Sequence, residues 1–209
     1  MQIAIALYPK FTLLDAIGPF QVFVDLPDVE CVLVAEHAGP VNDHSGRGAL
    51  VATHTFAEVT NPDIIVVPGG AVSQTVDADD PVVQWIRGVH PHTQWTSSVC
   101  TGALFLGLAG LLDGIPATTH WAFHDRIESL GAVPTLQRVV EAGKIVTAAG
   151  VSSGIDMALV LVAKIYGDDI ARAVPLAIEY APQPPFEAGH PARVDPEIRE
   201  LVRSMVAVL

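Results

Sequence analysis

The feature that most restricts the fold of this chain is the alternation of short apolar runs with longer segments of helical periodicity. Four runs rich in β-branched residues lie at residues 3–8, 31–36, 63–70 and 93–99. Strands that are almost continuously apolar are typical of parallel sheets, whose two faces are both covered. Helical patterns lie between and after them, at residues 15–26, 80–89, 101–112, 121–131 and 152–167. This order predicts an α/β fold, a doubly wound sandwich with a mostly parallel sheet and helices on both faces.

Two segments of the C-terminal half depart from this alternation. Residues 135–150 predict two strands joined by a short turn around Ala142 and Gly143. Residues 178–194 are rich in proline and predict a surface loop.

The last segment, residues 195–209, predicts a helix with one apolar face. Asp195 is a suitable N-cap and Pro196 suits the first helical position. The apolar residues at helical spacing are Ile198, Leu201, Val202, Met205 and Leu209. Two interpretations remain open, namely that this face packs on its own domain or that it contacts a second subunit.

The size and composition of the chain favour one compact domain over residues 1–209. Half of the 209 residues are hydrophobic and 16% are charged, so a large core is available. No apolar stretch approaches the roughly 18 to 20 residues that span a bilayer. The first residues, MQIAIALYPKF, lack the basic region and cleavage site of a secretory leader. With two cysteines far apart in the sequence, we expect free thiols and a cytoplasmic location.

The charge of the chain argues against nucleic acid and anionic membrane as partners. The formal net charge is -12 and the isoelectric point is near 4.8. Both partners require a basic surface, because their phosphate groups are anionic.

The stretch SVCTGAL, residues 98–104, places Cys100 between a predicted strand and a predicted helix. In an open α/β sheet, ligands bind beyond the carboxyl ends of the strands. A cysteine on such a turn has the position of a nucleophile elbow, and the helix N-terminus is expected to lower the pKa of its thiol. A buried structural thiol is the competing interpretation, since free cysteine is among the most buried residue types.

Two other strand ends point to the same edge of the sheet. Gly69 and Gly70 end the run VVPGG, where backbone N–H groups can approach a ligand and stabilise a developing anion. The alternative for this motif is an ordinary Pro-Gly-Gly turn. Asp15 follows the first strand among apolar residues, and either a helix N-cap or a catalytic carboxyl is consistent with that place.

The histidines of the chain are possible metal ligands, but their spacing does not indicate a metal site. His120 and His124 would share one helical face, yet no third ligand has suitable spacing and no HExxH motif is present. We expect no metal. His120 is instead a candidate for lining the pocket near Cys100, and Cys31, inside a predicted strand, is expected to be an inert core thiol.

Together these motifs resemble the ThiJ/PfpI superfamily of flavodoxin-like proteins, and within it the isocyanide (isonitrile) hydratases. The segments that carry the resemblance, in family order, are YPKFTLLDAIGPFQVF, DIIVVPGG, SSVCTGALFLGLAGLLDG, ATTHW, AAGVSSGIDMALVLVAKIYG and IEYAPQPPFEAGHP. Many superfamily members carry a glutamate near the cysteine, whereas Asp15 matches that position here, as in the hydratases. Peptidase-like members follow the cysteine with histidine, and Thr101 stands there in this chain.

The resemblance implies hydration of an organic isocyanide to the N-substituted formamide, without a cofactor. Cys100 would attack the terminal carbon, and Asp15 would donate a proton to that carbon and then activate water. Burial and the neighbouring thiolate should raise the pKa of Asp15. Thr101 and Gly70 are assigned more weakly to the substrate nitrogen or the attacking water. The resemblance and the apolar surplus also imply a homodimer with active sites near the interface.

Two alternatives come from other functional classes. One is a ligand-sensing domain related to the N-terminal domains of AraC-family transcriptional regulators, which share the fold and many motifs. The sequence has no helix-turn-helix module and no basic surface, which disfavours this role. The other is a redox-responsive protein that uses Cys100, because an exposed thiol of low pKa is readily oxidised.

Overall fold

The computed structural model describes residues 1–206, apart from the side chains of residues 72 and 74, and is built around one seven-stranded sheet. The strand order is β10-β11-β7-β6-β1-β2-β5. The strands are β1 (Gln2–Ala6), β2 (Glu30–Ala35), β5 (His54–Thr55), β6 (Ile64–Val67), β7 (Trp95–Val99), β10 (Val139–Ala142) and β11 (Ile145–Ala148). Every pairing in the sheet is parallel except that of β10 with β11. The predicted mostly parallel sheet is confirmed.

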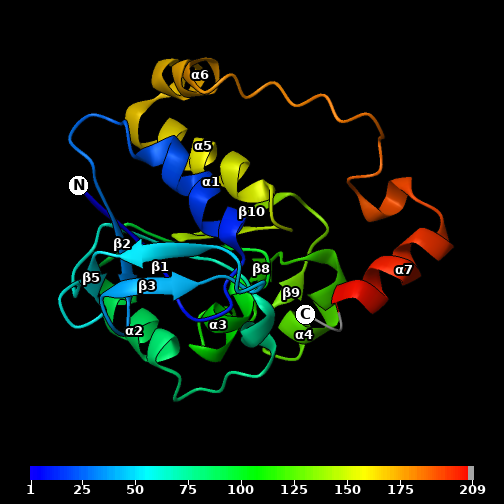
Figure 1. Cartoon of the computed structure of the whole chain (residues 1–209), viewed down its shortest axis with the longest axis horizontal. Helices are drawn as coiled ribbons and strands as arrows, with labels where there is room; N and C mark the ends of the chain where they lie inside the picture. The colour runs from blue at the N-terminus through cyan, green and yellow to red at the C-terminus, as the bar shows by residue number, and fades with distance from the viewer. Residues whose placement is uncertain (207–209) are drawn as a thin grey trace.

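Helices cover both faces of this sheet (Figure 1). One face carries α1 (Leu13–Phe23) and α5 (Ser153–Tyr166), with α6 (Asp168–Ala177) packed on the outer side of α5, and the other carries α2 (Pro81–Val89), α3 (Gly102–Leu108) and α4 (His124–Glu128). All four residues of β6 are therefore buried, as are four of the five in β1. This burial on both faces explains why the two strands read as continuous apolar runs. Within residues 1–206, no helix has the length and apolar character needed to cross a membrane.

Short strands outside the main sheet were missed by the sequence patterns. They form two small pairs, β3 (Gly39–Asn42) with β4 (Ala49–Ala52) and β8 (Pro116–Ala117) with β9 (Val133–Pro134). Runs of two to four residues are too short to show a period in the sequence. The predicted hairpin at 135–150 is confirmed as β10 and β11, and its turn contains Gly143 with φ +61°.

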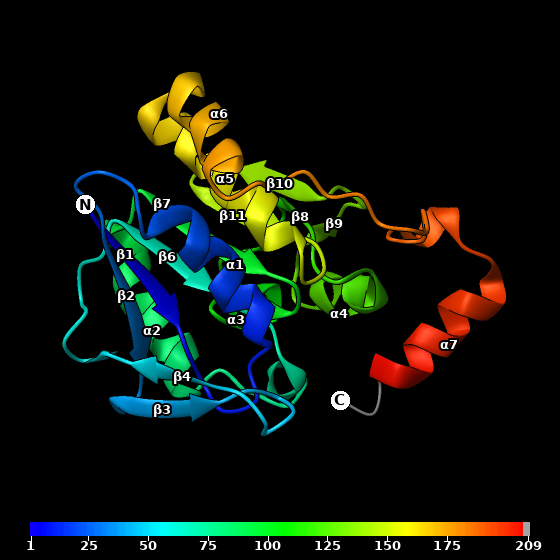
Figure 2. The ribbon, with the colours of Figure 1, turned by 45° about the horizontal axis from the view of Figure 1, so that its top comes forward.

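The C-terminal segment leaves the body of the molecule as an extended arm (Figure 2). Residues 178–194 contain only the short 3-10 turn Pro191–Arg193, and then α7 (Pro196–Val206) begins as predicted. Ile198, Leu201 and Met205 are 47%, 56% and 60% exposed. Most of this apolar face is therefore not buried on its own domain, although α7 contacts the body near its C-terminal end, where Val202 is half-buried and Arg203 lies over the Trp121 ring. Leu209 lies outside the described residues.

Candidate active site

Cys100 occupies a tight turn between β7 and α3, as predicted. Its backbone has φ +56°, which is unusual for a residue with a side chain. The turn is held on both sides: the Cys100 N–H donates to the Ala149 carbonyl at 2.9 Å, and the Thr119 hydroxyl donates to the Cys100 carbonyl at 2.8 Å. Strained backbone of this kind is kept only where neighbours fix it, and it concentrates at functional sites.

A cavity of about 290 Å³ opens onto this turn at the carboxyl ends of β6 and β7. Its lining residues are Thr12, His44, Gly70, Ala71, Cys100, Thr101, His120, Phe123, Val151 and Val206. A larger cavity of about 830 Å³ lies beside it, between the body and the arm, and the two share His120 and Val151. The site therefore has room for a small molecule next to the sulfur of Cys100.

Asp15 points into this region from the first turn of α1. Thr12, not Asp15, is the N-cap of that helix, so the capping interpretation of Asp15 is wrong. The Asp15 side chain is fully buried, and its Oδ2 accepts the Gly69 N–H at 2.8 Å. Its Oδ1 is buried without a hydrogen-bond partner among residues 1–206. A buried carboxyl oxygen left free in this way is available to a neighbouring thiol or a ligand.

Burial raises the pKa of Asp15 to about 7, against the opposing effects of the Gly69 N–H and the Cys100 thiol. The increase predicted from the sequence is confirmed, and its main cause is loss of solvent. Asp15 is thus poised to exchange protons near neutral pH.

The Cys100 thiol differs from the sequence expectation. Burial, followed by the negative charge of Asp15, raises its pKa, although hydrogen bonds from the N–H groups of Val151 and Thr101 oppose the increase. We expected the helix N-terminus to lower the pKa, and this was wrong. The thiol is only 7% exposed, so desolvation outweighs the favourable dipole of the seven-residue α3. Cys100 is both a buried thiol and a residue of the cavity wall.

Gly69 and Gly70 orient neighbouring side chains, whereas the sequence suggested that their N–H groups face a ligand. The Gly69 N–H is taken by Asp15, and the Gly70 N–H donates to Thr101 Oγ1 at 3.0 Å. A Cβ at Gly69 would lie 2.6 Å from the Thr101 backbone nitrogen, and one at Gly70 would lie 2.4 Å from the Lys10 carbonyl oxygen. Glycine is required at both positions because three backbone segments meet there. Since both N–H groups already have partners, the prediction that they donate hydrogen bonds to a developing anion is corrected.

His120 lies beside Cys100 across the same cavity, as the sequence suggested. Burial and the nearby His124 lower its pKa, so the imidazole is neutral at physiological pH. The ring packs closely on Gly150, where a Cβ would lie 2.8 Å from His120 Cδ2. Within residues 1–206, no group of three or more histidine, cysteine or acidic side chains is placed to hold a metal ion.

Sequence reasoning missed Tyr8 and Val151 beside the reactive pair, and it also missed the cavity residues Thr12, His44, Ala71, Phe123 and Val206. Tyr8 is buried, donates its hydroxyl to the Pro68 carbonyl at 2.7 Å, and has its pKa raised by burial and by the charges of Asp15 and Cys100. Val151 reaches the sulfur through its backbone N–H. Tyr8 begins the first family segment, which was a usable signal, but nothing in the sequence marks a backbone donor.

A family model describing the DJ-1/PfpI family matches residues 1–164. The chain belongs to the DJ-1/PfpI family. This assignment confirms the superfamily and the flavodoxin-like fold that the sequence motifs implied. The matched residues include every strand of the sheet and the turn at Cys100.

Two proteins resemble this DJ-1/PfpI chain over most of its length. The isonitrile hydratase of Pseudomonas putida is 44% identical over 191 residues, covering 91% of this chain and 83% of that protein. The crystal structure of a ThiJ/PfpI family protein from Pseudomonas syringae superposes with a TM-score of 0.91 at 34% identity, covering 99% of this chain and 86% of that one. The resemblance to isonitrile hydratases is thereby confirmed.

A third relative represents the alternative class. The HTH-type transcriptional regulator CdhR of Pseudomonas aeruginosa is 36% identical over 95 residues, covering 44% of this chain and 28% of that protein. This similarity is confined to less than half of the chain, whereas the similarity to the hydratase extends over nearly all of it.

Proposed function

We propose that this protein is an enzyme that hydrates organic isonitriles, R–N≡C, to N-substituted formamides. The observation that carries the proposal is that the buried Asp15 carboxyl interacts with the thiol of Cys100, which lines a cavity, in a chain 44% identical to an isonitrile hydratase. An isonitrile has an electrophilic terminal carbon and little polarity, which suits a cavity with a sulfur nucleophile and few charged groups.

The first half of the reaction forms a covalent thioimidate. The Asp15 carboxylate takes the proton of the Cys100 thiol while the sulfur attacks the terminal carbon, and a C–S bond forms. Asp15 then passes that proton to the same carbon, which gives R–N=CH–S–Cys100. A pKa of about 7 lets Asp15 accept the proton and release it again.

The second half hydrolyses this intermediate. Asp15 takes a proton from water as the water oxygen attacks the carbon, and the proton goes to the substrate nitrogen. The resulting R–NH–CH(OH)–S–Cys100 loses its hydroxyl proton through Asp15 to the departing sulfur. The C–S bond breaks, and the formamide and the free thiol are released. We assign to Thr101 the role of orienting the sulfur through its N–H, which favours the anion that departs.

Turnover on a panel of alkyl and aryl isonitriles tests the proposed function. We expect formation of the matching N-formamide, measured by liquid chromatography, at one molecule per isonitrile consumed. Retention of every isonitrile over hours at micromolar enzyme, with unchanged protein folding by circular dichroism, would contradict the proposal and favour a sensing role.

The pH profile provides a second prediction. Asp15 must be ionised to take the thiol proton, so kcat/KM should rise with pH up to about 7 and then level off. Steady-state assays between pH 5 and 9 measure this limb. A kcat/KM that stays constant from pH 5 upward, as expected for an aspartate with its ordinary pKa of about 4, would show that the buried carboxyl is not the group that controls the reaction.

We also propose that residues 1–209 form a single domain and that two copies of the chain form a homodimer. The supporting observation is that α6 and α7 bury none of their described side chains, while Leu176 and Leu201 are 80% and 56% exposed. Such apolar faces are typical of subunit contacts.

We expect sedimentation equilibrium at micromolar concentration to give the mass of a dimer, and we expect Leu201→Glu to lower the measured mass toward that of a monomer. The matched control is Val133→Glu, which changes an exposed valine on β9. A wild-type monomer would contradict this proposal.

The alternative roles receive less support. A redox sensor needs an accessible thiolate, whereas burial and Asp15 raise the pKa of the Cys100 thiol. The second cysteine, Cys31, has its pKa raised by burial to about 12. Both thiols are free in the structure, which is consistent with the proposed cytoplasmic location.

A further inference from the structure

The loop between β11 and α5 forms one side of the reactive turn. The Cys100 N–H donates to the carbonyl groups of Ala148 and Ala149 at 3.1 and 2.9 Å. Two residues later, the Val151 N–H donates to the Cys100 sulfur. The position of this one backbone donor relative to the sulfur therefore depends on how residues 149–152 are held.

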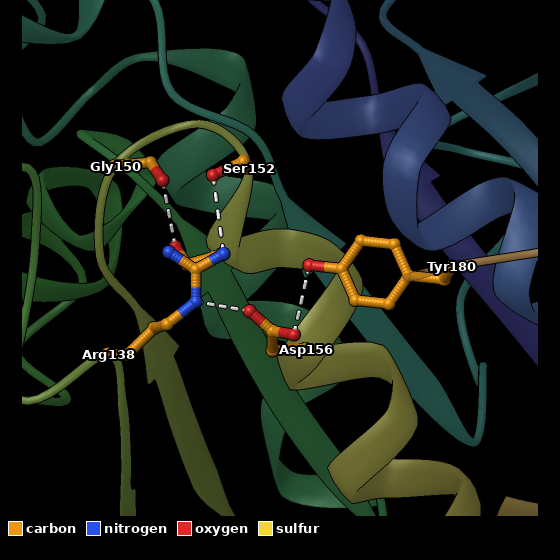
Figure 3. Close-up of polar contacts among 6 residues, drawn as sticks. Arg138, Gly150, Ser152, Asp156 and Tyr180 are labelled. Carbon is orange, nitrogen blue, oxygen red and sulfur yellow. Dashed lines mark hydrogen bonds and ion pairs between the residues drawn. The ribbon is translucent and has the colours of Figure 1, made fainter. Parts of the chain in front are cut away.

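Arg138 is the side chain that holds this loop from outside (Figure 3). It directly precedes β10, and its carbonyl accepts the Ala149 N–H at 2.9 Å. Its guanidinium donates through Nη2 to Ser152 Oγ at 3.2 Å and through Nε to the carboxylate of Asp156. Arg138 thus contacts the loop through both its backbone and its side chain, on either side of Val151.

Asp156 and Tyr180 fix the guanidinium in this orientation. Asp156 lies in the first turn of α5, and its second carboxylate oxygen accepts the Tyr180 hydroxyl at 3.1 Å. Figure 3 shows the arginine, the carboxylate and the phenol in a row beside the start of α5. Tyr180 belongs to the segment that follows α6, so this row joins the C-terminal arm to the loop next to Cys100. A planar guanidinium bound at two points is held more rigidly than a lysine could be.

We propose that Arg138 is a positioning residue: by clamping Ser152 and Asp156, it keeps the Val151 N–H directed at the Cys100 sulfur as negative charge develops there. Arg138 is outside the 290 Å³ cavity that contains Cys100 and lines only the neighbouring cavity, so it acts through the loop and not on the substrate. The inference rests on the proposed role of Cys100 as a nucleophile, but it does not depend on the identity of the substrate.

Arg138→Met tests the inference in a Cys31→Ala background, where Cys100 is the only thiol. We measure the rate of alkylation by iodoacetamide at pH 8, in which the sulfur displaces iodide. A hydrogen bond to an anionic acceptor favours the thiolate, so its loss should slow alkylation about threefold to tenfold. In isonitrile turnover, kcat should fall by a similar factor and KM should change little, because Arg138 lies outside the cavity that contains Cys100.

Lys164→Met is the matched control. Lys164 pairs with Glu141 at 2.6 Å and joins β10 to the far end of α5, whereas Arg138 joins the residue before β10 to the start of that helix. Both cations are partly exposed, with side-chain exposures of 33% for Lys164 and 49% for Arg138, so their removal should lower the melting temperature to a similar small extent. Only Arg138→Met should slow alkylation.

Two further variants keep the test decisive. Ser152→Ala removes only the contact between the guanidinium and the loop, and should slow alkylation in the same direction with an unchanged melting temperature. Arg138→Lys keeps the charge beside Asp156 and should recover part of the rate. Wild-type alkylation in both Arg138→Met and Ser152→Ala, or an equal loss in Lys164→Met, would overturn the inference. Because alkylation needs no isonitrile, this result is independent of whether wild-type turnover is found.

Discussion

Asp15→Asn is expected to lower kcat by about a hundredfold or more, the usual effect of removing a group that transfers protons. Asparagine accepts the Gly69 N–H as aspartate does, so the local geometry should persist while proton transfer is lost. Steady-state turnover of the best isonitrile measures the effect. The control is Asp80→Asn, which replaces the N-cap of α2 by an equally good cap and should retain wild-type kcat.

Stability gives an independent readout of the same variant. The folded-state pKa of Asp15, about 7, is above its ordinary value, so the folded protein binds this proton more tightly than the unfolded chain does. This stabilisation is complete at low pH and is lost as the pH rises through about 7. Asp15→Asn should therefore gain stability relative to wild type between pH 5 and pH 8, measured by urea unfolding. A constant difference across this range would contradict the raised pKa.

The thiol of Asp15→Asn should titrate at lower pH than that of the wild type. The opposite shift would show instead that a neutral Asp15 donates a hydrogen bond to the thiolate. The charge of Asp15 raises the pKa of Cys100 in the structure, so removing it should lower that pKa. Titration of the thiolate absorbance near 240 nm gives the direction of the shift.

Cys100→Ala is expected to abolish turnover and leave the fold intact. No C–S bond can form, and Asp15 alone has no nucleophile to activate except water. The substitution removes one sulfur atom from a buried turn that is held by backbone and Thr119 contacts, so the free energy of unfolding should change by about 1 kcal/mol or less. Calorimetry and the isonitrile assay measure the two effects.

Cys100→Ser is the companion variant, because it keeps a hydroxyl at the same place. A serine hydroxyl is a far weaker nucleophile than a thiol, so turnover should remain below about 1% of wild type. Loss of folding in both variants would restore the interpretation of Cys100 as a purely structural thiol. Turnover near the wild-type rate in either would exclude it as the nucleophile.

The main sheet could be predicted because its strands are buried on both faces. β6 and, after Gln2, β1 are continuously apolar, and a proline, Pro9 or Pro68, follows each strand and marks its end. The short pairs β3–β4 and β8–β9 and the helix α6 carry no such signal. α6 has no fully buried side chain, and only Ala171 and Val174 pack, partly buried, against the core, so its apolar pattern is weak. The sequence of α7 predicts a helix, but it does not show where that helix lies relative to the sheet.

The candidate site was predictable to the level of residues but not of hydrogen bonds. Cys100, Asp15 and His120 stand at strand ends or next to them, where an α/β fold brings side chains together. The partners of Gly69 and Gly70 could not be predicted, because they depend on how closely α1 and the Thr101 backbone approach. The predicted direction of the pKa shift of Cys100 was wrong for a related reason. The helix N-terminus is a local feature that the sequence shows, whereas the burial that raises the pKa depends on the tertiary structure.

Rapid-quench mass spectrometry of the enzyme during turnover tests the covalent mechanism most directly. Wild-type protein quenched within the first turnover should carry one added mass equal to that of the intact isonitrile, located on the peptide that contains Cys100. This mass should disappear as formamide accumulates, and Cys100→Ala should never acquire it. Formamide released by the wild type while Cys100 stays unmodified at every quench time, together with continued turnover by Cys100→Ala, would contradict attack by this thiol.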